Sequence, residues 1–338
     1  MPPKKKTKEA APKNSTPAHR KFRNFEEFYS DAYGARWPAL KETLLVDAKK
    51  VALWNRFCTL PRQEVLEGLV RVDPDGLCAA YAPKAKADSY IERPPEDEFS
   101  VKGYYILDYA SLLVVEQLQV GAFDKVLDMC AAPGGKSIAI AQFLSMDGNL
   151  CANEAKPARC TRLRRNLKDY VPVNYVPHEV SQRDAQTWYA PQSFTRVLVD
   201  APCSSERHLL LQAAEGDTQG LRAWNEGSSQ SCAALQRTLL LRALETVQVG
   251  GRVVYSTCSL SPLENDGVVR EALRCTRCEV RVSAITGMRL GEATAYGWLL
   301  LPDKAEGWGP IYMCAFEKVA EKREMRFSES SEEDEEDA

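Results

Sequence analysis

The sequence lacks long apolar runs. None of its 338 residues belongs to a stretch of about 18 consecutive apolar side chains, the length that a membrane-spanning helix needs. No apolar signal-peptide core follows Met1, so we expect no secretion signal. The eleven cysteines are odd in number and follow no regular framework, which indicates reduced thiols rather than a set of disulfides. We therefore expect an intracellular protein that does not interact with membranes.

Three common ligand motifs are also absent. Cys275 and Cys278 form a CxxC pair, but no second Cys or His pair lies nearby to complete a zinc site, so we expect no metal. Gly135-Lys136-Ser137 ends like a phosphate loop, yet Cys130 stands where that motif needs its first glycine. The GxGxxG spacing of NAD sites does not occur. Zinc, a phosphate loop and a dinucleotide are all disfavoured.

Charge is concentrated at the two ends of the chain, although the formal net charge is only -3. Residues 1–23 hold eight Lys or Arg side chains against one Glu, and residues 328–338 hold seven acidic side chains and no basic one. We expect a disordered basic arm over 1–23 and a disordered acidic tail over 321–338. The arm is compatible with nucleic-acid contact, an address or a solubilising tail. Its Lys- and Pro-rich composition fits a nuclear signal at least as well as an Arg-rich mitochondrial one.

Between these ends, a composition that is 44% hydrophobic supports one large domain and a smaller one. Apolar stripes at helical spacing predict a small helical N-terminal region over 24–81. The stripes are Phe25, Phe28 and Tyr29, then Trp37, Leu40 and Leu44. Residues 82–102, rich in Pro, Lys and acids, are predicted to form a linker or surface loop. The main domain is predicted over 103–320.

From residue 103 onward, apolar runs alternate with amphipathic stretches. The runs predict seven strands, at 125–130, 149–154, 174–180, 194–200, 252–257, 278–285 and 311–318. The stretches predict helices at 103–119, 136–145, 157–169, 230–248 and 262–273. This order is typical of an α/β fold with a mostly parallel sheet and helices on both faces.

In such a sheet, ligands bind at the carboxyl ends of the strands. The segments just after the predicted strands are Cys130–Ser137, Asn153-Glu154, Asp184, Asp200–Cys203 and Ser256–Ser259. We expect them to converge at one edge. Gly134 and Gly135 would let the backbone approach a ligand there, and the helix that Lys136 opens would favour anionic ligand atoms.

Two acidic residues indicate an adenosine-containing ligand. Glu154 follows Gly135 by about 20 residues, the spacing at which an acid accepts hydrogen bonds from ribose hydroxyls. Asp184, after the third predicted strand, is placed to accept a hydrogen bond from an adenine amino group. Glu154 alone is equally compatible with an ordinary surface acid at a strand end. The prediction of an adenosine-containing ligand therefore depends on Glu154 and Asp184 together.

Two cysteines at neighbouring strand ends indicate covalent chemistry. Cys203 follows Asp200, and Cys258 follows the next predicted strand. A thiolate that adds to C6 of cytosine makes C5 nucleophilic enough to accept a methyl group, which divides one hard step into easier ones. A nearby cation such as Lys136 would lower the thiol pKa. Asp200 would hydrogen-bond the cytosine amino group or N3.

Three stretches carry a family resemblance: LDMCAAPGGKS (127–137), VLVDAPCSSERH (197–208) and VVYSTCSLSPLEN (253–265). Over about residues 100–318 the chain resembles the Nol/Nop/Sun family of RNA cytosine-5 methyltransferases. GYYILDYASLL (103–113), WGPIYMCAFEK (308–318) and YGARWPALKETLL (33–45) are most similar to the subfamily that methylates mitochondrial ribosomal RNA. The resemblance implies a Rossmann-like class I methyltransferase fold, S-adenosylmethionine as cofactor and a mitochondrial location, with a nuclear or nucleolar location as the alternative.

The resemblance also implies residue roles. Cys258, in the Thr-Cys motif, is the expected nucleophile, and Cys203, in the Pro-Cys motif, assists product release. Asp200 and Lys136 are expected to face donor and target base. The expected cofactor contacts are Cys130, Ala131, Ala132, Pro133, Gly134, Gly135, Lys136, Glu154, Arg159, Asp184 and Asp200. Glu154 replaces a commoner Asp, and Ala185 replaces a frequent glycine, so the chain departs from the family pattern at both positions.

The predicted function is methyl transfer to C5 of a cytosine in RNA, with ribosomal RNA in an assembling subunit as the expected substrate. The alternative is a ribosome-assembly or scaffold protein that keeps the fold and acts by binding, through the two charged ends and the long loop 204–230. The resemblance adds a helical-repeat protein as an expected partner. Since no separate RNA-binding module is recognisable, RNA affinity is expected from the N-terminal region, basic helix residues or a partner.

Overall fold

The computed structural model describes residues 22–84 and 90–321. The predicted basic arm and acidic tail lie outside these residues, except for their innermost positions. Within them, the main sheet has nine strands, in the order β11-β12-β13-β9-β8-β5-β6-β7, and β10 also pairs with β13. No helix in the described part of the chain has the length and apolar character needed to cross a membrane, and no group of potential metal ligands occurs there.

Five strands of this sheet are parallel, and they lie next to one another. They are β5 (Lys125–Asp128), β6 (Asn149–Asn153), β7 (His178–Ser181), β8 (Phe194–Asp200) and β9 (Val247–Thr257). The long strand β13 (Ile311–Glu321) is antiparallel to β9. Its other edge pairs with β12 (Trp298–Leu300) and β10 (Cys278–Ser283), and β12 pairs with β11 (Glu292–Ala293). All seven predicted strands occur. The strands β11 and β12 were not predicted, because they are too short to show a periodic pattern of apolar residues in the sequence.

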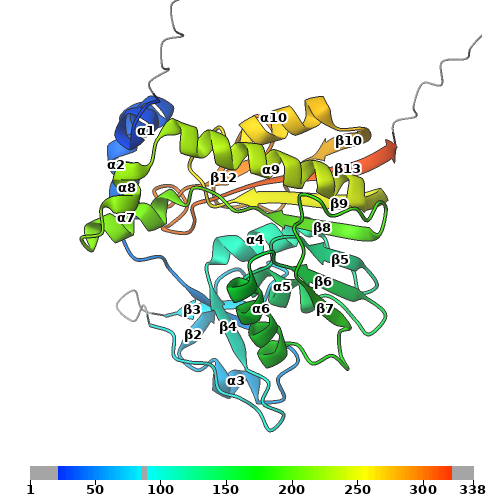
Figure 1. Ribbon diagram of the computed structural model, residues 1–338. Coiled ribbons are helices and arrows are strands. Elements are labelled where there is room, and N and C mark those ends of the chain that lie inside the picture. Colours follow the sequence, from blue (N-terminus) through cyan, green and yellow to red (C-terminus); the bar gives the residue numbers. More distant parts are fainter. Residues whose placement is uncertain (1–21, 85–89, 322–338) are drawn as a thin grey trace, which may run out of the picture.

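Helices cover both faces of the sheet, as predicted (Figure 1). One face carries α4 (Tyr109–Leu118), α5 (Gly135–Ala141) and α6 (Pro157–Tyr170), and the other carries α9 (Glu226–Thr246) and α10 (Asp266–Cys275). Successive strand residues point to opposite faces. Accordingly, Val126 belongs to the apolar cluster beneath α4–α6, whereas its neighbour Leu127 belongs to the cluster beneath α9 and α10.

The N-terminal region is only partly helical. Helices α1 (Phe25–Tyr33) and α2 (Trp37–Leu44), joined by the short 3-10 helix η1 (Gly34–Arg36), form where the apolar stripes predict them. The prediction is wrong beyond residue 50, where strands form a small antiparallel sheet in the order β2-β3-β1-β4. Its strands are β1 (Val51–Trp54), β2 (Leu69–Arg71), β3 (Ala80–Pro83) and β4 (Tyr104–Leu107), with the single turn α3 (Arg62–Val65) between β1 and β2. All four residues of β1 are buried, and a short, fully buried run shows no period that separates strand from helix.

Strand β4 also changes the start of the main domain. The predicted helix 103–119 begins as this strand, which pairs with β1, and α4 starts only at Tyr109. Asp108 follows the strand and caps the helix, because its Oδ1 accepts a hydrogen bond of 2.8 Å from the amide of Ala110. The predicted main domain therefore includes one strand of the small sheet.

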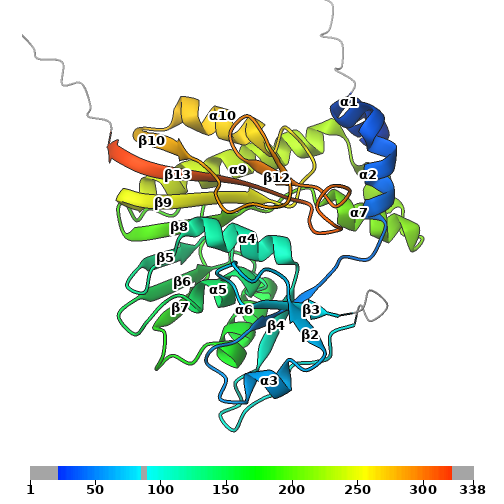
Figure 2. The same cartoon turned by 180° about the vertical axis from the view of Figure 1, so that it is seen from behind.

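The N-terminal region lies at two places around the main domain (Figures 1 and 2). The predicted loop 204–230 contains α7 (Glu206–Ala214) and α8 (Gln219–Ala223), and α1 and α2 pack there in a separate apolar cluster that includes Tyr29, Leu210 and Trp224. The small sheet packs instead against α4–α6. Residues 45–50 connect the two parts along one side of the molecule.

Candidate active site

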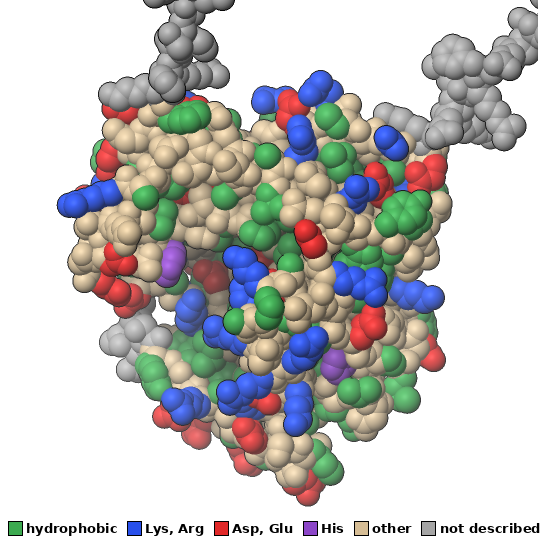
Figure 3. Space-filling model, in the orientation of Figure 1, with side chains coloured by type: hydrophobic (Ala, Val, Ile, Leu, Met, Phe, Trp, Pro, Cys, Tyr) green, Lys and Arg blue, Asp and Glu red, His purple; other side chains and the backbone are tan. Residues whose placement is uncertain are grey.

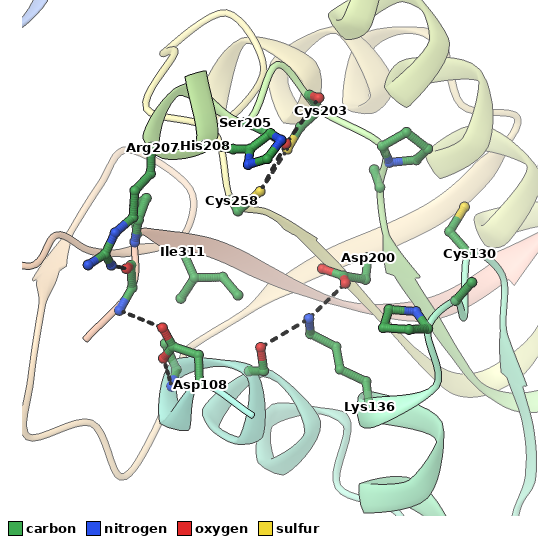
Figure 4. Close-up of a pocket in the computed structure, with 18 of the residues that line it drawn as sticks. Asp108, Cys130, Lys136, Asp200, Cys203, Ser205, Arg207, His208, Cys258 and Ile311 are labelled. Carbon is green, nitrogen blue, oxygen red and sulfur yellow. Dashed lines mark hydrogen bonds and ion pairs between the residues drawn. The ribbon is translucent and has the colours of Figure 1, made fainter. Parts of the chain in front are cut away.

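A cavity of about 1060 Å³ opens at the carboxyl ends of β5, β8 and β9 (Figure 4). Several of the residues predicted from strand ends line it together: Cys130, Ala132, Pro133, Lys136, Arg159, Asp200, Cys203 and Cys258. Other parts of the chain complete the wall, among them Ala48 from the connecting segment, His208 of α7 and Ile311 of β13. The residues predicted from the strand ends therefore converge at this edge of the sheet.

The glycine turn between β5 and α5 is fixed by contacts from β4 and α6. Gly134 has a φ of +116°, a backbone conformation that side chains disfavour. A Cβ on Gly135 would lie 2.9 Å from the ring of Tyr105 on β4. From α6, Arg159 Nη2 donates to the Ala132 carbonyl at 2.6 Å and Asn166 Nδ2 donates to the Pro133 carbonyl at 2.7 Å. The small sheet and α6 together fix the turn that lines the cavity.

Lys136 and Asp200 form an ion pair within the cavity wall (Figure 4), with 2.7 Å between Nζ and Oδ2. Ser256 Oγ donates to the other carboxylate oxygen at 2.8 Å, and Lys136 also donates to Ser111 Oγ at 3.3 Å. Burial lowers the pKa of Lys136, but the charge of Asp200 and its hydrogen bond outweigh burial and leave that pKa above its ordinary value. Lys136 is therefore a cation at neutral pH.

The two cysteines face each other, with 3.0 Å between their Sγ atoms (Figure 4). Ser205 Oγ lies 3.5 Å from each sulfur. The hydrogen bond from Cys203 lowers the pKa of Cys258, against the effect of burial, and Ser205 lowers it further. The same contact raises the pKa of Cys203 well above its ordinary value. Cys258 thus ionises first, and its pKa is lowered mainly by Cys203 rather than by the predicted cation Lys136.

Two buried carboxylates, Glu206 and Glu264, lie behind the cysteines. Ser204, next to Cys203, has its hydroxyl within hydrogen-bonding reach of both. Glu206 also accepts from Ser259 Oγ at 3.1 Å and from the Leu260 amide at 3.0 Å, and both residues follow Cys258. The backbone on each side of the thiol pair is therefore anchored to shared carboxylates.

The same network reaches two helices. Gln236 of α9 donates to Glu264 Oε2 at 2.8 Å and to the Pro202 carbonyl at 2.9 Å. From α1, the Tyr29 hydroxyl donates to Glu206 Oε1 at 2.6 Å. Burial and the nearby Glu206 charge raise the pKa of Glu264. The N-terminal helices are consequently part of the scaffold that positions the cysteines.

The two predicted adenosine-binding acids do not line the cavity. Glu154 is only 5% exposed; its Oε1 accepts from the Lys156 amide at 2.8 Å, and its Oε2 lies 3.4 Å from Arg159 Nη1. Asp184 is exposed beyond β7, where its Oδ1 accepts from the Gln186 amide at 3.0 Å. Arg159, which does line the cavity, connects Glu154 to it.

The family follows from comparison with known proteins. Residues 115–315 match the family model described as 16S rRNA methyltransferase RsmB/F, which is more than half of the chain. This chain belongs to the RsmB/F family. The predicted Sun-family resemblance and its assignment as a methyltransferase are confirmed.

Curated relatives extend the match beyond the family domain. The chain is 32% identical to the 5-cytosine rRNA methyltransferase NSUN4 of Bos taurus, with 87% of each protein covered. It is 32% identical to the mitochondrial tRNA (cytosine(34)-C(5))-methyltransferase of Mus musculus, covering 89% of this chain and 91% of that protein. It is 34% identical to the 5-cytosine rRNA methyltransferase nsun-4 of Caenorhabditis elegans over 67% of this chain, but spans only 52% of that longer relative.

The fold of this RsmB/F protein has a close counterpart among solved structures. NSun6 from Pyrococcus horikoshii, solved with SFG, superposes with a TM-score of 0.68 at 17% sequence identity. The alignment covers 88% of this chain and 98% of that one. The predicted Rossmann-like class I methyltransferase fold is therefore confirmed.

Proposed function

We propose that this RsmB/F protein transfers a methyl group from S-adenosylmethionine to C5 of a cytosine in RNA, with ribosomal RNA as the substrate. The observation that carries the proposal is the thiol pair Cys203–Cys258 in one cavity with the ion pair Lys136–Asp200. Relatives named 5-cytosine rRNA methyltransferases support the substrate atom and the RNA class. A relative named as a tRNA methyltransferase makes tRNA the second candidate.

The residues present fit an adenosine-containing methyl donor. The glycine turn packs tightly against α6 and β4, where a Cβ on Gly134 or Gly135 would meet Leu163 or Tyr105, and it brings Ala132, Pro133 and Lys136 to the cavity wall. Glu154, which Arg159 connects to the cavity, is the acceptor proposed for the ribose hydroxyls, and Asp184 is the acceptor proposed for the adenine end. When bound, S-adenosylmethionine supplies the electrophilic methyl group.

Cys258 is the proposed nucleophile. It is exposed to the cavity, and its lowered pKa increases the fraction of thiolate, which is the reactive form. Its thiolate would add to C6 of the cytosine, and the electron pair of the C5–C6 double bond would become available at C5. C5 would then take the methyl group as the bond between that group and the donor's sulfonium sulfur breaks, leaving a neutral thioether. Asp200, held by Lys136 and Ser256, is placed to hydrogen-bond the base and orient its ring.

Cys203 is the proposed release residue. Its pKa is raised mainly by the hydrogen bond to Cys258, so bonding of Cys258 to C6 removes the main cause of the high pKa. The Cys203 thiol could then release its proton to solvent, and the resulting thiolate could accept the proton from C5. Loss of that proton restores the C5–C6 double bond and breaks the Cys258–C6 bond, which frees the methylated base.

Ser205→Ala is expected to shift the acidic limb of the pH profile of kcat/KM to higher pH. The hydroxyl of Ser205 lowers the pKa of Cys258, so its removal raises that pKa and reduces the thiolate fraction. We expect a loss of roughly threefold to tenfold at neutral pH, because one pKa unit changes that fraction about tenfold. Ser231→Ala, on the exposed side of α9, serves as the control. An unshifted limb would show that Ser205 does not tune the nucleophile.

We infer a mitochondrial location from the relative whose name states it; the nuclear alternative depends only on the composition of residues 1–23. The helical-repeat partner stays a prediction. The scaffold alternative and the enzyme differ in one assay, bisulfite sequencing of RNA from cells with and without the protein. If the protein is a methyltransferase, at least one ribosomal RNA cytosine should resist bisulfite conversion only in cells that contain the protein. If removing the protein makes no cytosine in any RNA convertible, the result favours the scaffold function.

A further inference from the structure

A second cavity, of about 530 Å³, lies between two loops that flank strands of the small sheet (57–59 and 99–101), the carboxyl-terminal half of α6 and the segment 171–180 that follows it. Its apolar wall includes Phe57, Val101 and Leu167, which are buried. Two aromatic rings at its edge are open to solvent, Phe99 at 70% and Tyr175 at 51% exposure. The proposed methylation chemistry uses none of these residues.

Cations line the same cavity and continue along α6. Arg164 and Lys168 belong to its wall. Arg159, Arg162, Arg165 and Lys168 recur every third residue of the helix, and side chains three apart on a helix are neighbours. Arg159 lines the catalytic cavity, whereas Lys168 lines the second one. These four side chains, here called the α6 ridge, thus join the two cavities, and Lys and Arg side chains gather over α6 in Figure 3.

Most of this charge has no ion-pair partner in the part of the chain that the structure describes. Arg159 pairs with Glu154, but Arg162, Arg164, Arg165 and Lys168 form no ion pair with any residue in the ranges 22–84 and 90–321. The neighbouring acid Asp169 is engaged by Lys102 at 2.7 Å. Unpaired, exposed cations beside open aromatic rings make the combination that binds single-stranded nucleic acid, where cations contact phosphates and rings stack on bases.

We propose that the α6 ridge and the second cavity bind single-stranded RNA next to the target cytosine, with one base stacked on Tyr175 or Phe99. The inference rests on the proposed function, since it concerns how RNA reaches the Cys258 cavity. The target base must be unstacked to reach a thiol, and a site that holds the neighbouring strand open favours that state. It also supplies the RNA affinity for which no separate module is recognisable.

A protein partner is the competing occupant, because the second cavity is largely apolar. RNA is favoured for two reasons. The cations continue without interruption from the second cavity to the catalytic one, a path that a nucleic-acid strand requires and a protein contact does not. The rim also carries Arg164, Lys168 and His178 but no acidic side chain among its lining residues, which suits a polyanion.

The test is fluorescence anisotropy with a labelled single-stranded oligocytidine over a series of salt concentrations. Tyr175→Ala is expected to weaken binding at least about fivefold, and Tyr175→Phe, which keeps the ring, is expected to bind normally. Arg165→Glu combined with Lys168→Glu is expected to weaken binding more than about tenfold and to flatten the salt dependence. Matched controls are Phe123→Ala and Lys125→Glu, at exposed positions by the amino end of β5, which are expected to bind like the wild type.

Unchanged affinity in Tyr175→Ala and in the charge-reversal variant would overturn the proposal. If light scattering then shows a wild-type dimer that Tyr175→Ala dissociates, the second cavity is a protein contact. The binding assay does not depend on catalysis, so the two proposals fail separately. A wild-type protein that binds oligocytidine through this surface but methylates no RNA contradicts the proposed function alone. A protein that methylates RNA while all variants bind normally contradicts this inference alone.

Discussion

Cys258→Ala is expected to lower the rate of methyl transfer to RNA by at least about a thousandfold, because the variant has no sulfur to add to C6 and C5 stays unactivated. The measurement is transfer of a labelled methyl group from S-adenosylmethionine to ribosomal RNA in a single turnover. Binding of S-adenosylmethionine should change little, since the glycine turn and Glu154 are untouched.

The matched control is Cys275→Ala, which removes an exposed thiol at the end of α10, away from the cavity lining. It is expected to retain full activity. Full activity of Cys258→Ala would contradict the assignment of the nucleophile. Loss of activity in both variants would indicate general damage to the fold.

Cys203→Ala is expected to accumulate a covalent complex between protein and RNA. The variant keeps Cys258, so the sulfur–C6 bond forms, but the residue proposed to accept the C5 proton is missing and release is slow. The complex is measured as a retarded band on a denaturing gel. Loss of the Cys203 hydrogen bond also raises the pKa of Cys258, so we expect the complex to form faster as the pH rises from neutral to mildly alkaline.

The double variant Cys203→Ala/Cys258→Ala is the control and is expected to give no retarded band. A band that persists in the double variant would mean that another side chain bonds to RNA. Absence of a band in Cys203→Ala, together with normal turnover, would remove Cys203 from the release step.

The parallel half of the sheet was predictable because its strands are separated by strongly periodic helices. Leu163 and Leu167 of α6, for example, recur at helical spacing and are buried. The small N-terminal sheet was not predictable in the same way. The run Val51–Trp54 is apolar at every position and buried on both sides, and its partner β4 lies about 50 residues later in the chain. Strands that pair over such a distance in the chain leave no pattern in the local sequence that would reveal the pairing.

The candidate site was predictable where its residues directly follow strands. Cys130, Asp200, Cys203 and Cys258 line one cavity because the topology brings carboxyl ends of parallel strands to one edge. The supporting residues were missed. Glu206 and Glu264 lie in the quoted motifs, but only tertiary contacts place both against Ser204.

The role of the N-terminal helices was also hidden in the sequence. Tyr29 reads as one residue of an apolar stripe, and its ring is indeed packed in the aromatic cluster with Phe25 and Trp37. Its hydroxyl, however, contacts Glu206 at 2.6 Å behind the thiol pair. Arg207 donates to the Val46 carbonyl at 2.7 Å and so joins α7 to the segment between the two N-terminal parts. The region predicted as a small helical unit therefore supports the loops that carry Cys203 and Cys258.

Mass spectrometry of the complex trapped with Cys203→Ala tests the central claim most directly. After digestion of protein and RNA, the account predicts one cross-linked peptide, which contains Cys258 bonded to a single cytidine that carries the transferred methyl group. The sequence around that cytidine would identify the RNA substrate as well. A cross-link at any other residue, or a trapped nucleotide other than cytidine, would contradict the proposed chemistry.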